Sequence, residues 1–255
     1  MSQLILTQHD KVLLITLNRP EARNALDNAT LQQLAEELEA AANNASIAAC
    51  VITGNTRFFA AGADLREMAE KDLPATFNDL RPQLWARLNA FPKPLVAAVN
   101  GYALGAGCEL VLLCDLAVAG ENAQFGLPEI KLGIIPGAGG TQRLIRCVGK
   151  ALASRMILSG ESISAQTALQ AGLISDIYPD ELCVDYALTL AKTLSRHAPL
   201  ALQAAKQSLR QAQEVPLQAG LIQERQLFTL LAATADREEG IAAFLEKRPA
   251  HYRGC

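Results

Sequence analysis

The chain has 255 residues, of which 50% are hydrophobic and 19% charged, so it can bury a large core and carry a catalytic cleft. Its 23 basic and 26 acidic residues give a net charge of -3, which provides no long-range attraction to nucleic acid or to an anionic membrane. The six cysteines form no CxxC pair and no His/Cys cluster, so the composition signals neither a zinc site nor a disulfide framework.

The beginning of the chain has no basic region followed by an apolar run, because Asp10 stands where a signal sequence would need that run. The most apolar stretch, 95–119, is interrupted by Asn100, Glu109 and Asp115. A helix that crosses a bilayer would carry these side chains only at considerable cost. We therefore expect a cytoplasmic protein with no membrane partner.

The first two thirds of the chain alternate apolar runs with amphipathic helical patterns. Strands are expected at 13–17, 49–53, 95–99 and 116–119. Helices are expected at 26–42, 81–89 and 107–114, with a further helical stretch through Met68 and a polar, mobile loop at 71–78. Such alternation favours the α/β class.

Strand signals fade from about Ser164, and helical periods dominate the rest of the chain. They predict helices at 165–171, 182–195, 199–212, 215–233 and 236–247. We therefore expect an α/β core over residues 1–195 and a C-terminal helical region over residues 196–255.

The segment 100–109, NGYALGAGCE, joins a buried strand to a buried helix. Its glycines let a ligand approach the backbone, and free N–H groups at the start of the helix favour developing negative charge. An oxyanion hole can be built in this way. Glu109 lies one turn into the helix among leucine and valine, where an ionised carboxylate needs either a structural partner or a chemical purpose.

A second carboxylate, Glu129, follows Pro128 in a turn that leads through further glycines, Gly137 among them, to a helix at Thr141. Two carboxyl groups whose surroundings move their pKa values apart can divide acid and base roles, as the addition of water to a double bond requires. The spacing leaves open whether the two meet, since a lone glutamate here is typical of a solvated turn. The small-residue segment 60–64 is likewise either a tight turn or the source of a second N–H donor.

Other catalytic motifs are missing from the sequence. Neither glycine-rich segment has the third glycine of a dinucleotide fingerprint or the Gly-Lys-Ser/Thr ending of a phosphate loop. There is no GxSxG elbow and no HExxH, and the three histidines are far apart. The basic cluster at 247–253 is typical of a solvated tail, with an anion site as the alternative.

Five segments, taken in order, resemble the signature of the crotonase (enoyl-CoA hydratase/isomerase) family. They are AGADL at 61–65, PKP at 92–94 with 97–101, GAGCEL at 105–110 with 114–115, FGLPE at 125–129 and PGAGGTQRL at 136–144. The resemblance extends from Leu13 through the C-terminal helices. It implies a crotonase-like spiral of ββα units with a C-terminal helical trimerisation region, assembled as a homotrimer or a dimer of trimers.

The resemblance also implies roles for particular residues. Glu109 and Glu129 are the expected catalytic pair, and the backbone N–H groups of Ala63 and Ala106 are the expected oxyanion hole, with Ala61 as a weaker alternative to Ala63. The residues expected around the substrate are Ala61, Gly62, Asp64, Leu65, Gly105, Pro128 and Gly137. The substrate is an acyl-CoA thioester, so coenzyme A enters as part of the substrate, and no separate cofactor and no metal are expected.

The retention of Glu109 favours a hydratase, which converts a trans-2-enoyl-CoA into a 3-hydroxyacyl-CoA, over an enoyl-CoA isomerase. Within the family the chain most resembles hydratases of phenylacetate degradation whose acyl chain ends in a second carboxylate, and Arg81 and Arg87 are the candidates for binding that group. Two alternatives remain. An RNA-binding relative is disfavoured by the acidic balance and the lack of a lysine-rich helix, and a catalytically silent scaffold is disfavoured by the retention of both glutamates. No nucleic-acid partner is therefore expected, whereas a second family member is a further candidate partner.

Overall fold

The strands of the protein form two sheets in the computed structural model, which describes residues 2–255. The larger sheet has the order β1-β2-β3-β5-β7-β10 and the smaller one the order β4-β6-β8-β9. The two outer pairs β1/β2 and β8/β9 are antiparallel, and all other neighbours are parallel. The strands are β1 (Leu4–His9), β2 (Val12–Leu17), β3 (Ala49–Thr53), β4 (Phe58–Ala60), β5 (Leu95–Val99), β6 (Tyr102–Leu104), β7 (Leu116–Gly120), β8 (Gln124–Gly126), β9 (Ile163–Ser164) and β10 (Asp176–Tyr178).

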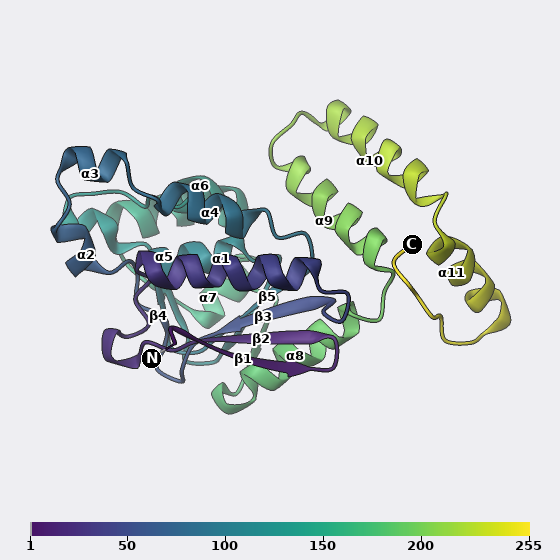
Figure 1. Ribbon diagram of the computed structural model, residues 1–255. Helices are drawn as coiled ribbons and strands as arrows, with labels where there is room; N and C mark the ends of the chain where they lie inside the picture. The colour runs from purple at the N-terminus through teal and green to yellow at the C-terminus, as the bar shows by residue number, and fades with distance from the viewer. Residues whose placement is uncertain (1) are drawn as a thin grey trace.

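Successive strands enter different sheets, and this alternation builds the spiral. β3, β5 and β7 are neighbours in the larger sheet, whereas the strands that directly follow them, β4, β6 and β8, are neighbours in the smaller sheet. Helices follow each such pair of strands, so the chain advances by one position in both sheets with every ββα unit (Figure 1). The α/β spiral expected from the sequence is therefore confirmed.

Helices cover both faces of the larger sheet, whose central strands β3 and β5 are buried at every position. On one face α8 packs against the side chains of Val51, Val96 and Val118 through Ala187 and its neighbours. The other face carries the main core, in which α1, α4 and α5 take part (Figure 1). The α-helices of the body are α1 (Asn28–Asn43), α2 (Leu65–Ala69), α3 (Leu73–Phe77), α4 (Arg81–Asn89), α5 (Ala106–Leu113), α6 (Gly140–Ser159), α7 (Ala165–Gln170) and α8 (Cys183–Leu194).

The polar stretch 71–78 differs from its sequence-based expectation. It contains the short helix α3 rather than a continuous loop. Asp72 caps this helix by accepting a hydrogen bond from the Ala75 N–H at 2.8 Å, and Pro74 occupies a position in its first turn where the missing N–H costs nothing. A proline and a capping aspartate within a polar stretch were thus the overlooked helix signals.

The last three helices, α9 (Pro199–Ala212), α10 (Leu217–Leu231) and α11 (Ala235–Glu246), extend away from the body (Figure 1). Lys206 anchors α9, because its buried ammonium group forms a 2.6 Å ion pair with Asp115 and donates to the Lys93 carbonyl oxygen at 2.6 Å. Many large apolar side chains beyond it are exposed, among them Leu217, Ile222, Phe228, Leu230, Phe244 and Leu245. The sequence-based division at residue 195 falls between α8 and α9, and a separation into two domains stays a prediction. Within residues 2–255, no helix combines the length and apolarity needed to cross a membrane.

Candidate active site

Glu109 lies on α5, and two glycines before it decide where that helix begins. Gly105 has φ 50° and ψ −124°, a conformation that residues with a side chain rarely adopt. Gly107 packs so closely against the carbonyl oxygen of Ala60 that no Cβ fits between them. The sequence therefore brings the start of α5 directly against strand β4.

The carboxyl group of Glu109 is held by two backbone amides. The residue is 2% exposed, and its Oε1 accepts hydrogen bonds from the N–H groups of Ala138 at 2.7 Å and Gly140 at 2.8 Å. Burial raises the pKa of this carboxyl group, and the two amide hydrogen bonds oppose that rise. Oε2 makes no hydrogen bond within residues 2–255, so it is available to a bound water molecule.

Glu129 lies in the 3-10 helix η2 (Pro128–Leu132), and its carboxyl group has no fixed partner for one oxygen. Oε2 is buried without a hydrogen bond to another described residue. Burial, together with the nearby charge of Glu109, raises the pKa of Glu129 to about 7. A Cβ on Gly105 would lie 3.0 Å from the Oε1 of Glu129, so this carboxyl group rests against the start of α5.

Both glutamates line one cleft with a volume of about 500 Å³. The convergence that the sequence left open is therefore present. Most of the other predicted site residues line the same cleft, namely Ala61, Gly62, Ala63, Leu65, Gly105, Ala106, Pro128 and Gly137. The cleft is formed by segments that are far apart in the sequence, which is typical of a catalytic site carried by loops and helix termini of an α/β fold.

Two residues predicted to contact the substrate have their side chains elsewhere. Asp64 does not line the cleft, because it caps α2 through the Arg66 N–H at 3.1 Å and pairs with Arg19 at 3.0 Å. Arg87 forms a 2.7 Å ion pair with Glu39 and is likewise absent from the cleft. Neither side chain lines the cleft, so their contact with substrate stays a prediction, whereas Arg81 does line the cleft.

Two backbone N–H groups at the cleft have no acceptor. Neither Ala63 nor Ala106 donates a backbone hydrogen bond within residues 2–255. The N–H of Ala61, the weaker of the expected donors, is engaged by the Arg23 carbonyl oxygen at 3.1 Å. The two segments are adjacent, since a Cβ on Gly105 would lie 3.6 Å from the Cα of Gly62. An oxygen that acquires negative charge can accept from both groups here.

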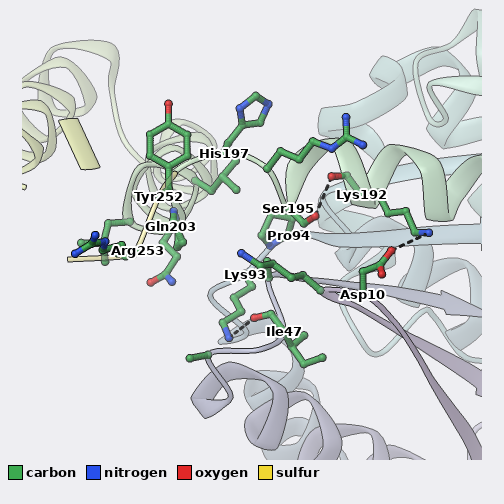
Figure 2. A pocket seen from close by; sticks show the side chains of 18 of the residues that line it. Asp10, Ile47, Lys93, Pro94, Lys192, Ser195, His197, Gln203, Tyr252 and Arg253 are labelled. Carbon is green, nitrogen blue, oxygen red and sulfur yellow. Dashed lines mark hydrogen bonds and ion pairs between the residues drawn. The ribbon is translucent and has the colours of Figure 1, made fainter. Parts of the chain in front are cut away.

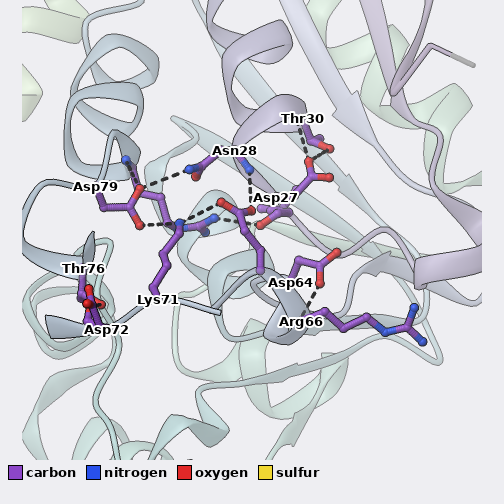
Figure 3. A network of polar contacts seen from close by, with 12 residues as sticks. Asp27, Asn28, Thr30, Asp64, Arg66, Lys71, Asp72, Thr76 and Asp79 are labelled. Carbon is purple, nitrogen blue, oxygen red and sulfur yellow. Dashed lines mark hydrogen bonds and ion pairs between the residues drawn. The ribbon is translucent and has the colours of Figure 1, made fainter. Parts of the chain in front are cut away.

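The segment that carries Ala63 is fastened to the loop before α1. Leu26 donates to the Gly62 carbonyl oxygen at 2.8 Å and accepts from the Asp64 N–H at 3.3 Å. Arg19 joins Asp64 to Asp27 by 3.0 Å ion pairs to both. Asp27 in turn caps α1 by accepting a hydrogen bond from the Thr30 N–H at 2.7 Å (Figure 3). Sequence reasoning missed Arg19, whose Asn-Arg-Pro context indicates only the end of a strand.

A second hollow, of about 660 Å³, lies between the body and α9 with the C-terminal segment. Two of the basic side chains that line it are engaged by the protein itself, because the Lys93 ammonium donates to three carbonyl oxygens and Lys192 pairs with Asp10 at 3.2 Å (Figure 2). In the part of the chain that the structure describes, no group of three or more His, Cys, Asp or Glu side chains is placed to hold a metal ion.

The fold and the cleft define an α/β enzyme that holds two carboxyl groups beside a pair of free amide N–H groups. The family model for enoyl-CoA hydratase/isomerase matches residues 7–254, and the chain belongs to that family. It is 74% identical over 254 residues to the 2,3-dehydroadipyl-CoA hydratase of Escherichia coli, covering 100% of both chains. It is 45% identical to the mitochondrial enoyl-CoA hydratase of Pongo abelii, covering 96% of this chain and 85% of the relative. The crystal structure of an enoyl-CoA hydratase from Bacillus anthracis superposes with a TM-score of 0.95 at 36% identity, over 100% of both chains.

Proposed function

We propose that this protein is an enoyl-CoA hydratase, which adds water across the double bond of a trans-2-enoyl-CoA to give a 3-hydroxyacyl-CoA. The observation that carries the proposal is the placement of the buried Glu109, the half-buried Glu129 and two unengaged backbone N–H groups along one cleft. Hydration needs this combination, because one group must activate water, another must supply a proton, and the thioester oxygen must bear charge in between.

Each functional group in the cleft has its own role in the hydration reaction. The thioester oxygen accepts hydrogen bonds from the N–H groups of Ala63 and Ala106, which stabilise the enolate-like charge. Glu109, oriented by its two amide donors, accepts a proton from water as the water oxygen bonds to the β-carbon. Glu129 donates a proton to the α-carbon, a role that suits a carboxyl group with a pKa of about 7. The product gains one hydroxyl group and one proton, and proton transfer from Glu109 to Glu129 resets the pair.

A double-bond isomerase needs only one carboxyl group to carry a proton between two carbons. The position of Glu109, bound through one oxygen and open at the other, supports hydration instead. A spectrophotometric assay that compares crotonyl-CoA with a 3-enoyl-CoA tests this choice. Rapid loss of the crotonyl-CoA absorbance supports the hydratase, and turnover of the 3-enoyl-CoA alone would refute it.

The similarity to the Escherichia coli enzyme supports 2,3-dehydroadipyl-CoA as the substrate. This acyl chain has six carbons and ends in a free carboxylate. Measuring kcat/KM across short, long, aromatic and dicarboxylyl enoyl-CoA esters tests the assignment, which predicts the highest value for the dicarboxylyl ester. The place in phenylacetate degradation stays a prediction, as does the cytoplasmic location.

We expect α9 to α11 to mediate assembly into a homotrimer or a dimer of trimers, because many of their large apolar side chains are exposed. Light scattering on the purified chain distinguishes these states from a monomer, and co-purification with a second family member would identify such a partner.

Dialysis against EDTA should leave hydration unaffected, because the proposed mechanism uses neither a metal nor a cofactor beyond the coenzyme A of the substrate. Binding to RNA, one of the two remaining alternatives, would show as salt-sensitive retention on an RNA column.

A further inference from the structure

Arg81, the first residue of α4, is a cation in the wall of the catalytic cleft whose direct contacts leave most of its donors unused. Its Nη1 donates to the Leu26 carbonyl oxygen at 3.0 Å. Within residues 2–255 the guanidinium group makes no other hydrogen bond and no ion pair within 4 Å. Because arginine has five N–H donors in a planar fork, this side chain is anchored at one point and can still bind an anion through two parallel hydrogen bonds.

Of the four acidic side chains whose charges act on Arg81, three are engaged by other cations, and the fourth, Glu109, accepts from two backbone amides. Glu67 and Asp79 both bind the ammonium group of Lys71, each at 2.8 Å (Figure 3). Asp27 pairs with Arg19 at 3.0 Å. These acids therefore lower the local potential without satisfying the donors of Arg81.

The other cations that line the cleft are less suited to bind an anion. The Lys71 ammonium group is already held by two carboxylates, and Lys131 is exposed, so that water and salt screen its charge. Trp85, one turn beyond Arg81 on α4, also lines the cleft, and its buried Nε1–H has no acceptor in the described chain. The wall made by α4 is thus rich in donors that the protein itself leaves unmatched.

We propose that Arg81 binds the distal carboxylate of a dicarboxylyl enoyl-CoA and so sets the preference of the cleft for such substrates over plain acyl chains. The inference rests on the proposed function, since it assigns the acyl end of the same cleft. A guanidinium that is half-buried and tethered at one nitrogen binds a carboxylate with little loss of side-chain entropy. A methyl group at the same place would leave the guanidinium without its partner.

The test measures binding separately from catalysis. Adipyl-CoA and hexanoyl-CoA are saturated, unreactive ligands of equal chain length that differ only in the terminal carboxylate. Calorimetric titration of the full-length protein gives the ratio of their dissociation constants. Wild-type protein should prefer adipyl-CoA, and Arg81→Gln should reduce that preference by about 10- to 100-fold, the range for a hydrogen-bonded charged pair. Glutamine keeps a polar side chain at this position and removes the charge.

Two further variants make the result specific. Arg81→Lys keeps the charge without the fork and should retain part of the preference. Arg87→Gln removes an arginine of the same helix that pairs with Glu39 outside the cleft, and its preference should equal that of the wild type. An unchanged preference in Arg81→Gln, or an equal loss with both ligands, would overturn the inference.

Failure of the inference and failure of the proposed function give different results. A wild-type protein that hydrates crotonyl-CoA but binds adipyl-CoA and hexanoyl-CoA equally refutes the carboxylate site and leaves the hydratase intact. A wild-type protein that prefers adipyl-CoA through Arg81 but hydrates no enoyl-CoA supports the carboxylate site and refutes the proposed reaction.

Discussion

The carboxyl group of Glu129 rests against Gly105, with its Oε1 3.0 Å from the position that a Cβ on residue 105 would occupy. Gly105 also has φ 50° and ψ −124°, which a side chain would strain. The start of α5 and the orientation of the second glutamate therefore depend on each other. A side chain at residue 105 would therefore displace the carboxyl group of Glu129.

Replacing this glycine should disable the enzyme. We expect Gly105→Ala to lower kcat for crotonyl-CoA by roughly 100-fold or more, because the methyl group displaces the carboxyl group of Glu129 and strains the backbone. Gly220→Ala is the matched control, since a Cβ there would meet only Val215 Cγ2, at 3.8 Å. Comparable rates for the two alanine variants would show that the contact is without consequence.

The two glutamates should be individually essential. In Glu109→Gln and Glu129→Gln we expect kcat for hydration to fall by ~10²–10⁴-fold, the usual contribution of a positioned acid or base. Circular dichroism and thermal unfolding should show an intact fold in both variants. Near-normal turnover by both would contradict the division of roles between them.

The raised pKa of Glu129 predicts a dependence of stability on pH. The folded protein holds this carboxyl group at a pKa of about 7, above the usual value of 4.5, so its ionisation opposes folding. Relative to Glu129→Gln, the wild type should be equally stable below pH 4.5, lose stability progressively between pH 4.5 and 7, and carry the full penalty above pH 7. We expect a penalty on the order of 1–2 kcal/mol at pH 8, after allowance for the partly solvated carboxyl group. Urea unfolding at pH 4.5 and pH 8 measures it, and a difference that does not change with pH would contradict the assignment.

Arg19 should stabilise the segment that carries Ala63. Its side chain is 14% exposed and pairs with Asp27 and Asp64, so Arg19→Met leaves two nearby carboxylates without their common cation. We expect the free energy of unfolding to fall by about 2–4 kcal/mol, as in other mostly buried ion pairs. The control is Arg155→Met, because Arg155 is 71% exposed and its pair with Glu161 should contribute less than about 1 kcal/mol. Equal effects in urea unfolding would argue against a role for Arg19 beyond that of a surface charge.

Several elements were predictable because their sequence signals are local. β3, β5, α4 and α9 begin and end at the residues expected from the sequence, since continuous apolar runs mark the buried strands and regular periods mark the helices. β1 was missed because it lies at the edge of the sheet, where only Leu4 is buried and the other side chains show no alternation. β9 and β10 were missed because short strands carry too few residues to form a pattern.

The site was predictable in its residues and not in its geometry. The motifs identified Glu109 and Glu129, but only the fold shows that the two line one cleft. Whether Ala61 or Ala63 has a free N–H group depends on the hydrogen bond from Ala61 to the Arg23 carbonyl oxygen. Neither segment has a sequence feature that predicts this contact. The ion pair between Arg19 and Asp64 was unpredictable for the same reason, because an arginine that pairs with two acids distant in the sequence produces no periodic pattern.

The ion pair between Lys206 and Asp115 helps to fix which surface the last three helices expose to water. Lys206 and Arg210 fasten α9 to the body through Asp115 and nearby backbone carbonyl oxygens, while many large apolar side chains of α10 and α11 face outward. These exposed side chains make α10 and α11 a surface whose contact with water is unfavourable. Self-association through this surface would increase with protein concentration, so light scattering on a dilution series should show a falling mean mass.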